Sequence, residues 1–139
     1  MKTHENVADL AGRILISTMF LTSGLSKISG YAGTQGYMES VGVPGALLPL
    51  VIALEVLGAI AVIVGYRTRL AAGALAAFTL AAAVLFHSGA DQMQQLLFMK
   101  NVAITGGFLF LVARGAGDWS LDARRDRLTS SREPVATPV

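Results

Sequence analysis

The feature that most constrains the fold is a twenty-residue apolar stretch with one carboxyl near its middle. Residues 47–66 read LLPLVIALEVLGAIAVIVGY, and Glu55 is their only ionisable group apart from the tyrosine at the end. A helix of this length rises about 1.5 Å per residue and just crosses the roughly 30 Å hydrocarbon layer of a bilayer. A charged side chain at mid-depth costs about 2.5–3.5 kcal/mol, so Glu55 is expected to face protein, water or a ligand.

Composition extends this membrane assignment to the whole chain. The 139 residues, enough for one domain, are 53% hydrophobic and 14% charged, whereas a soluble domain carries about 25% charged residues. The net charge is only +2 and the basic residues form no groove-like cluster, so nucleic acid is not an expected partner. The absence of cysteine excludes thiolate catalysis, disulfide exchange and cysteine-ligated metals.

The hydrophobic pattern predicts an all-α membrane protein, a bundle of four transmembrane helices with both termini cytoplasmic. The first apolar segment is too long for a signal-peptide core and lacks a clear A-x-A cleavage site, so it is expected to be retained. A short helix from Thr34 to about Val41 is expected in the first loop, where Gly42 and Pro44 end it. The predicted transmembrane helices cover residues 7–25, 47–66, 70–87 and 96–113.

The four-helix domain is expected to occupy residues 1–127. Residues 88–95 are predicted to form a polar loop, and Trp119 is predicted to anchor an interfacial turn after the last span. Residues 128–139 are rich in serine, threonine and proline, and they are predicted to form a disordered tail.

Basic residues are distributed unevenly between the two sides of the predicted spans. Only Lys27 and Lys100 fall on the side of the first and third loops, and the other nine of the eleven basic residues fall on the opposite side. Because lysine and arginine accumulate on the cytoplasmic side, both termini are expected there. The nine are Lys2, Arg13, Arg67, Arg69, Arg114, Arg124, Arg125, Arg127 and Arg132.

One face of the first predicted helix is more polar than the rest. Arg13, Ser17, Phe20, Gly24 and Lys27 recur at helical spacing. This face is expected to point into the bundle, where Gly24 would permit close helix contact. For Arg13 a second interpretation stays open, in which its side chain snorkels to the nearer membrane surface. Tyr31 and Tyr37 in the first loop either anchor it at the lipid surface or form part of a lid over a pocket.

Each predicted helix sends an ionisable group into the same half of the bundle. Lys27 ends the first, Glu55 lies within the second, His87 ends the third, and Lys100 with Asn101 begins the fourth. Because these groups share a depth, we expect them to line one polar pocket. Glu55 is interpreted either as a functional proton-binding group or as a structural carboxyl that is protonated or paired and ties helices together.

A lipophilic molecule with a polar head suits such a pocket. A quinone or quinol is one example, because its oxygens require donors such as histidine or lysine and a carboxylate that accepts a proton. The two histidines, His4 and His87, are predicted on opposite sides of the membrane, so no metal site is expected. His87 is interpreted either as a hydrogen-bonding group at the helix end or as a proton donor to the ligand.

The order and spacing of the motifs resemble the DoxX family of small four-helix bacterial inner-membrane proteins. The resemblance covers residues 8–125. It is carried by Gly24-x-x-Lys27, Glu55-x-x-Gly58, Gly65-x-x-x-Arg69-x-x-Ala72, His87, Lys100-Asn101, Gly106-Gly107, the later Gly-x-Gly and a Ser-Leu-Asp close, and by the loop from Gly30 to Gln35 with Gly42-Val43-Pro44.

The resemblance implies a four-helix fold and an association with quinol oxidation, thiosulfate:quinone oxidoreduction or quinone detoxification. It implies Glu55 and His87 as catalytic groups and Lys27, Lys100 and Asn101 as ligand-binding groups. Arg13 and Arg69 are further candidates for ligand binding. No covalently bound cofactor is implied. Electrons would come from a partner or from a bound organic cofactor, because the chain has no site for its own redox metal.

We therefore expect a quinone-binding accessory subunit of an oxidoreductase or redox-stress system, whether or not it turns over a substrate itself. Its expected partners are membrane lipids, redox-enzyme subunits and a second copy of the chain. Two rival functions stay open. A small proton-coupled transporter would alternate Glu55 between a proton and a cationic substrate. A scaffold or assembly factor would dock other membrane proteins and perform no catalysis.

Overall fold

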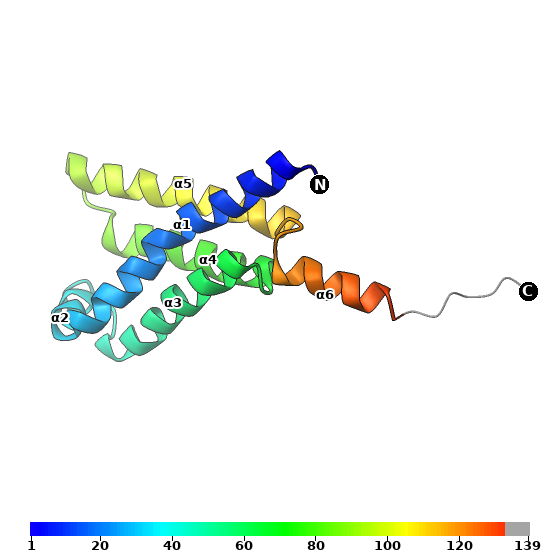
Figure 1. The fold of residues 1–139 in the computed structure, drawn as a ribbon. Coiled ribbons are helices and arrows are strands. Elements are labelled where there is room, and N and C mark those ends of the chain that lie inside the picture. The colour runs from blue at the N-terminus through cyan, green and yellow to red at the C-terminus, as the bar shows by residue number, and fades with distance from the viewer. Residues whose placement is uncertain (133–139) are drawn as a thin grey trace, which may run out of the picture.

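The computed structural model describes residues 1–132, and all regular structure in that range is helical. This confirms the predicted all-α class. Figure 1 shows the long helices gathered in one bundle, with the last helix projecting from it. The elements are α1 (Thr3–Ser29), α2 (Tyr31–Ser40), η1 (Gly45–Leu47), α3 (Leu48–Val64), α4 (Thr68–Phe86), α5 (Gln92–Arg114) and α6 (Leu121–Ser130).

The four long helices pack in the order α1, α3, α4, α5. The helix α1 lies along α3, α4 lies along α5, and α3 joins the two pairs through α4. Figure 1 shows the helices of each pair running in opposite directions. Phe20 of α1 meets Phe108 of α5 with 5.3 Å between ring centroids, and Leu75 of α4 is fully buried in the same cluster. The core thus draws side chains from both pairs.

The surface of the bundle is apolar. Leu15 is 75% exposed, Phe110 71% and Leu50 67%. Among the described residues, three helical stretches are long and apolar enough to cross a membrane, by length and composition. These stretches are Gly45–Val64, Thr68–Phe86 and Gln92–Arg114. The helix α1 is long enough as well, with 27 residues, but it carries charged groups that are bound inside the bundle.

The inward face predicted for the first helix is confirmed. Arg13, Ser17, Phe20 and Gly24 are all buried, and the side chain of Lys27 is 24% exposed. The observed helix, Thr3–Ser29, is longer than the predicted 7–25. Its polar N-terminal turn is stabilised because the Glu5 carboxylate accepts a hydrogen bond from the backbone N–H of Lys2.

The other helix ends differ from the predicted ones for local reasons. The helix α3 ends at Val64 rather than at residue 66, because Gly65 adopts a left-handed conformation with φ 71°. The predicted loop 88–95 is wrong in its second half, because α5 begins at Gln92. There the Asp91 carboxylate caps the helix by accepting a hydrogen bond from the backbone N–H of Gln94.

The segments outside the long helices are more ordered than predicted. The helix of the first loop, α2, begins at Tyr31, three residues before Thr34. The predicted disordered tail is wrong for residues 128–130, which continue α6. That helix begins where the Ser120 hydroxyl caps it by accepting a hydrogen bond from the backbone N–H of Ala123. Residues 133–139 of the predicted tail lie outside the described part of the chain.

Candidate functional site

A cavity of about 430 Å³ opens at the end of the bundle where α1 ends and α5 begins, and we call it the Lys27–Glu55 cavity. All four long helices contribute to its wall, together with α2. Its walls are mainly apolar, and the polar groups lie among them. The polar lining residues are Ser23, Lys27, Thr34, Tyr37, Glu55, Thr79, His87, Lys100 and Asn101.

An ion pair between α1 and α3 forms one wall of the cavity. The Lys27 ammonium donates to both oxygens of Glu55, at 3.0 and 2.9 Å. It also donates to the Ser23 hydroxyl at 2.6 Å, and that hydroxyl donates to Glu55 at 3.4 Å. The side chain of Glu55 is 5% exposed. A carboxylate so deeply buried requires a partner of this kind, because an unpaired charge would be costly at this depth.

A close approach between the two helix backbones places this pair. A Cβ atom at Gly24 would lie 2.7 Å from Val56 Cγ2 and 3.1 Å from Glu55 Cβ, so glycine is the residue that this contact permits. Lys27 stands about one helical turn beyond Gly24, and its side chain reaches Glu55 from there. The Gly24-x-x-Lys27 motif thus supplies both the glycine at which α1 and α3 approach closely and the ammonium group that binds Glu55.

His87 is held in a fixed orientation at the end of α4. Its Nδ1 atom lies 3.1 Å from the side-chain oxygen of Gln94, and Gln94 is itself fixed by the Asp91 cap. With the amide oxygen as acceptor, Nδ1 is the donor, which leaves Nε2 of a neutral imidazole as an acceptor. The ring therefore has one nitrogen left for a ligand.

Lys100 and Asn101 supply further donors from the first half of α5. The Asn101 residue is 6% exposed and lines the cavity. Within residues 1–132, neither its side-chain amide nor the Lys100 ammonium has a hydrogen-bond partner. The Asn101 amide is open to the cavity, and the buried side-chain atom without a partner in this range is instead Ser17 Oγ. The amide can therefore donate to a polar group bound in the cavity.

The helix α2 covers the cavity from the side of the first loop. Met38 is 4% exposed, and Thr34, Tyr37 and Met38 all line the cavity. The Tyr37 ring lies 5.5 Å from that of Phe86, centroid to centroid, which joins α2 to the end of α4. Of the two interpretations of this loop, a lipid-surface anchor and a lid, the contact of Tyr37 with the cavity favours the lid. Tyr31, the other predicted aromatic residue of this loop, is not part of the lining.

Arg13 and Arg69 were expected among the ligand-binding groups, but neither of them lines this cavity. Arg13 is 1% exposed and donates to Asp9 and to the backbone oxygens of Ile63 and Trp119. It thereby ties α1 to the end of α3 and to the turn before α6. Its burial also excludes the snorkelling alternative. Arg69 lies at the opposite end of the bundle, where it donates to the Val112 carbonyl.

Three polar residues of the site were not predicted from the sequence. Ser23 stands one turn before Lys27 and bridges it to Glu55, and its i, i+4 spacing to Lys27 is a signal that the sequence does carry. Thr34 and Thr79 line the cavity. The Thr79 hydroxyl is satisfied by the Leu75 carbonyl within its own helix, so the sequence carries no signal for its position.

The described residues contain no cluster of three or more His, Cys, Asp or Glu side chains that could hold a metal. The arrangement instead combines one carboxylate, two ammonium groups, one amide and one imidazole around a largely apolar space. Pockets of about 300–1,000 Å³ with apolar walls and a few polar groups are typical of small-molecule sites. The chemistry available here is hydrogen bonding to, and proton exchange with, a mainly apolar ligand.

Comparison with known proteins relates the chain to a bacterial membrane family. The DoxX family model matches residues 8–88. Inner membrane protein YqjF of Escherichia coli is 52% identical over 123 residues, which covers 88% of this chain and 95% of that protein. Inner membrane protein YphA of E. coli is 37% identical over 123 residues, 83% of this chain and 88% of the relative.

A more distant relative comes from Bacillus subtilis. It is named "Putative oxidoreductase CatD" and is 33% identical over 114 residues, which covers 76% of this chain and 84% of that protein. No solved structure matches the chain.

Proposed function

This chain belongs to the DoxX family, and we propose that it binds a quinone or quinol in the Lys27–Glu55 cavity as an accessory subunit of an oxidoreductase or redox-stress system. It is a multi-pass protein of the bacterial inner membrane. The proposal includes α1 as a fourth span and both termini in the cytoplasm, in keeping with the excess of basic residues at that end.

The observation that carries the proposal is that three kinds of group line one cavity with mainly apolar walls. Two hydrogen-bond donors have no protein partner among the described residues, and the carboxyl group of Glu55 is paired with Lys27. The Asn101 amide and the Lys100 ammonium have no protein partner within residues 1–132 and would donate hydrogen bonds to carbonyl oxygens. Glu55 would accept a hydrogen bond or a proton from a hydroxyl, and Lys27 would hold its carboxyl group in position for that contact. The apolar wall suits a ring and its lipophilic tail.

A bound quinone would supply the redox chemistry, and the protein residues would bind and orient it. His87 is positioned by Gln94 so that its second nitrogen can accept or pass a proton at the end of α4. The name of the B. subtilis relative adds support for a redox role, because it describes that protein as an oxidoreductase.

The Lys27–Glu55 pair weighs against the transporter alternative. A proton-coupled exporter of cations needs a carboxylate that its substrate can reach, but Lys27 occupies both oxygens of Glu55. A cationic substrate would also meet Lys100 at the same cavity. A neutral ligand is not repelled by Lys100 and does not need to displace Lys27 from Glu55.

Equilibrium binding of a short-chain ubiquinone to the purified protein in nanodiscs tests the proposal. We expect Asn101→Leu to weaken binding about tenfold, the loss of one hydrogen bond to a buried group. We expect a similar loss for Glu55→Gln, because it removes the negative charge and one of the two acceptor oxygens that hold Lys27, and the amide cannot take up a proton. Glu39→Gln, an equivalent change on the exposed face of α2, is the matched control.

Wild-type affinity in both cavity variants would exclude this cavity as the quinone site. A loss of the same size in Glu39→Gln would show that the effect is unrelated to the cavity. Thermal unfolding of each variant in the same nanodiscs separates a binding defect from a folding defect.

A further inference from the structure

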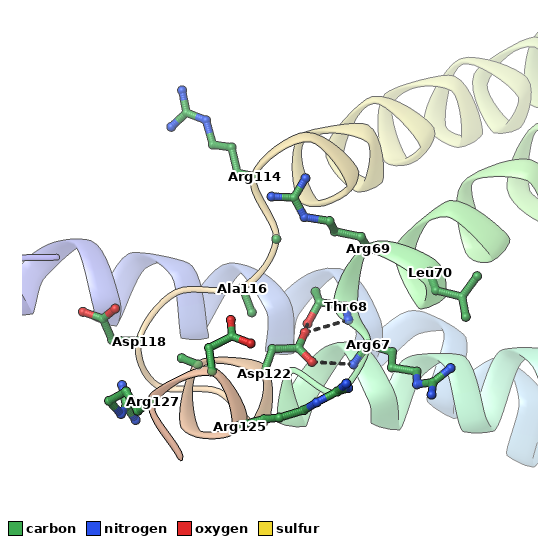
Figure 2. A pocket seen from close by; sticks show the side chains of 13 residues that line it. Arg67, Thr68, Arg69, Leu70, Arg114, Ala116, Asp118, Asp122, Arg125 and Arg127 are labelled. Carbon is green, nitrogen blue, oxygen red and sulfur yellow. Dashed lines mark hydrogen bonds between the residues drawn. The ribbon is translucent and has the colours of Figure 1, made fainter. Parts of the chain in front are cut away.

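A second cleft, of about 720 Å³, lies at the opposite end of the bundle from the Lys27–Glu55 cavity. It is formed where α4 begins, α5 ends and α6 begins, and Figure 2 shows side chains from all three elements around it. We call it the arginine cleft, because its lining includes Arg67, Arg69, Arg114, Arg125 and Arg127.

Three carboxylates also line the cleft, those of Asp118, Asp122 and Asp126, so its five arginines keep an excess of two positive charges. Asp122 accepts hydrogen bonds from the backbone N–H groups of Arg67 and Thr68 and from the Thr68 hydroxyl, at 2.7–2.9 Å (Figure 2). Asp118 accepts from the N-terminal ammonium and from Asn6. Within residues 1–132, no ion pair joins any arginine of the cleft to a carboxylate. Apart from one bond from Arg69 to the Val112 carbonyl, the guanidinium groups are therefore available for an external anion.

The bonds of Asp122 also fix the geometry of the cleft. Arg67 has a left-handed backbone with φ 44°, a conformation that costs energy for a residue with a side chain. Asp122 holds this turn in place through both of its oxygens, and so it ties the start of α4 to α6. Because the turn is fixed, the backbone positions from which the side chains of Arg67 and Arg69 extend are fixed relative to α6.

The cleft lies at the ends of two apolar stretches that are long enough to cross a membrane, which is where a bilayer would place its lipid headgroups. The apolar stretches Thr68–Phe86 and Gln92–Arg114 respectively begin and end here. Leu70 lines the cleft and is 67% exposed, so an apolar surface continues from the arginines along α4. A ligand that combines an anionic head with an acyl chain would meet both surfaces at once. A soluble anion would use only the arginines.

We propose that the arginine cleft binds the phosphodiester headgroup of an anionic phospholipid, such as phosphatidylglycerol. Arg69 and Arg114, from the facing ends of α4 and α5, bind the phosphate, because guanidinium groups match phosphate oxygens in a bidentate geometry. Arg125 of α6 provides further positive charge on the other side of the cleft. The acyl chain lies over Leu70. Basic clefts between transmembrane helices are suited to such headgroups.

Titration of the detergent-solubilised full chain, followed by native mass spectrometry, tests this proposal. The ligands are phosphatidylglycerol, phosphatidylethanolamine with the same acyl chains, and glycerophosphoglycerol as the soluble headgroup. We expect phosphatidylglycerol to bind with the highest affinity. Arg69→Gln/Arg114→Gln should weaken it about 25-fold, about fivefold for each positive charge removed near the headgroup.

Arg124→Gln/Arg132→Gln removes the same charge outside the arginine cleft and is the matched control, expected to bind almost as the wild type does. Arg114 makes no side-chain hydrogen bond within residues 1–132, so Arg114→Gln alone should fold normally and lose about fivefold. An equal loss in the control pair would overturn the proposal, because net charge alone would then explain binding. Equally tight binding of phosphatidylethanolamine or of the soluble headgroup would also overturn it.

Discussion

Lys27 Nζ of α1 lies 3.0 and 2.9 Å from the two carboxylate oxygens of Glu55 on α3. The contact joins two helices that also approach closely at Gly24, and it forms one wall of the cavity to which we assign quinone binding. A buried ion pair is weak evidence for stability by itself, because desolvation offsets much of the attraction. Its value here is that it places a carboxylate and an ammonium group beside an apolar space.

The first prediction concerns the coupling within this pair. Lys27→Met leaves the Glu55 carboxylate buried without its cation, and we expect it to destabilise the protein by about 3 kcal/mol. Lys27→Met/Glu55→Gln removes both charges and should recover most of that loss. Unfolding by SDS titration in mixed micelles measures each variant. Additive effects of the two single substitutions, with no recovery, would show that the pair is not coupled.

The second prediction concerns the helix contact that positions the pair. The added methyl of Gly24→Ala would meet Val56 Cγ2 at 2.7 Å, so α1 must move away from α3. We expect a loss of about 1–3 kcal/mol in unfolding free energy. Gly12→Ala on the same helix meets nothing within 4 Å and should be stabilising by about 0.5–1 kcal/mol. The same effect in both variants would refute close packing at Gly24.

Much of this site could be predicted from the sequence, because charged residues in apolar helices have few allowed positions. Glu55 interrupts an apolar run, and Lys27 follows the polar face of α1, so depth and helical spacing were sufficient to bring them together. Arg13 shares that face, yet it is bound to backbone oxygens at the other end. Helical periodicity predicts on which face of the helix a residue lies, but it does not predict which group that residue binds.

The parts that could not be predicted depend on contacts between distant segments. Asp122 holds the turn before α4 across more than fifty residues, and no local pattern encodes that contact. The start of α5 at Gln92 depends on the Asp91 cap, which the polar composition of residues 88–95 obscured. The helix α6 has no buried residues, so no hydrophobic period marked it.

The third prediction concerns pH. Burial raises the pKa of Asp122, but the hydrogen bonds from Thr68 and Arg67 outweigh it, so the pKa lies below the ordinary 3.8. The folded state thus holds this proton less tightly than the unfolded state. Stabilisation by Asp122 is complete above about pH 3.8 and is lost as the pH falls through the lower folded-state value.

Thermal unfolding in detergent between pH 2 and pH 6 measures this dependence. We expect Asp122→Asn to have a lower unfolding temperature than the wild type at pH 6 and a smaller decline on acidification. Some decline should remain, because the hydrogen bond from the N-terminal ammonium lowers the pKa of Asp118 as well. Parallel curves for the two proteins would contradict the role assigned to Asp122.

The most direct test of the central claim is native mass spectrometry of the protein extracted from its own membrane into lipid nanodiscs. The wild type, Glu55→Gln and the control Glu39→Gln are compared. We predict a quinone-mass adduct on the wild type and on Glu39→Gln that is absent from, or strongly reduced in, Glu55→Gln. If all three proteins carry no quinone, or carry it equally, the assignment of quinone binding to the Lys27–Glu55 cavity is contradicted.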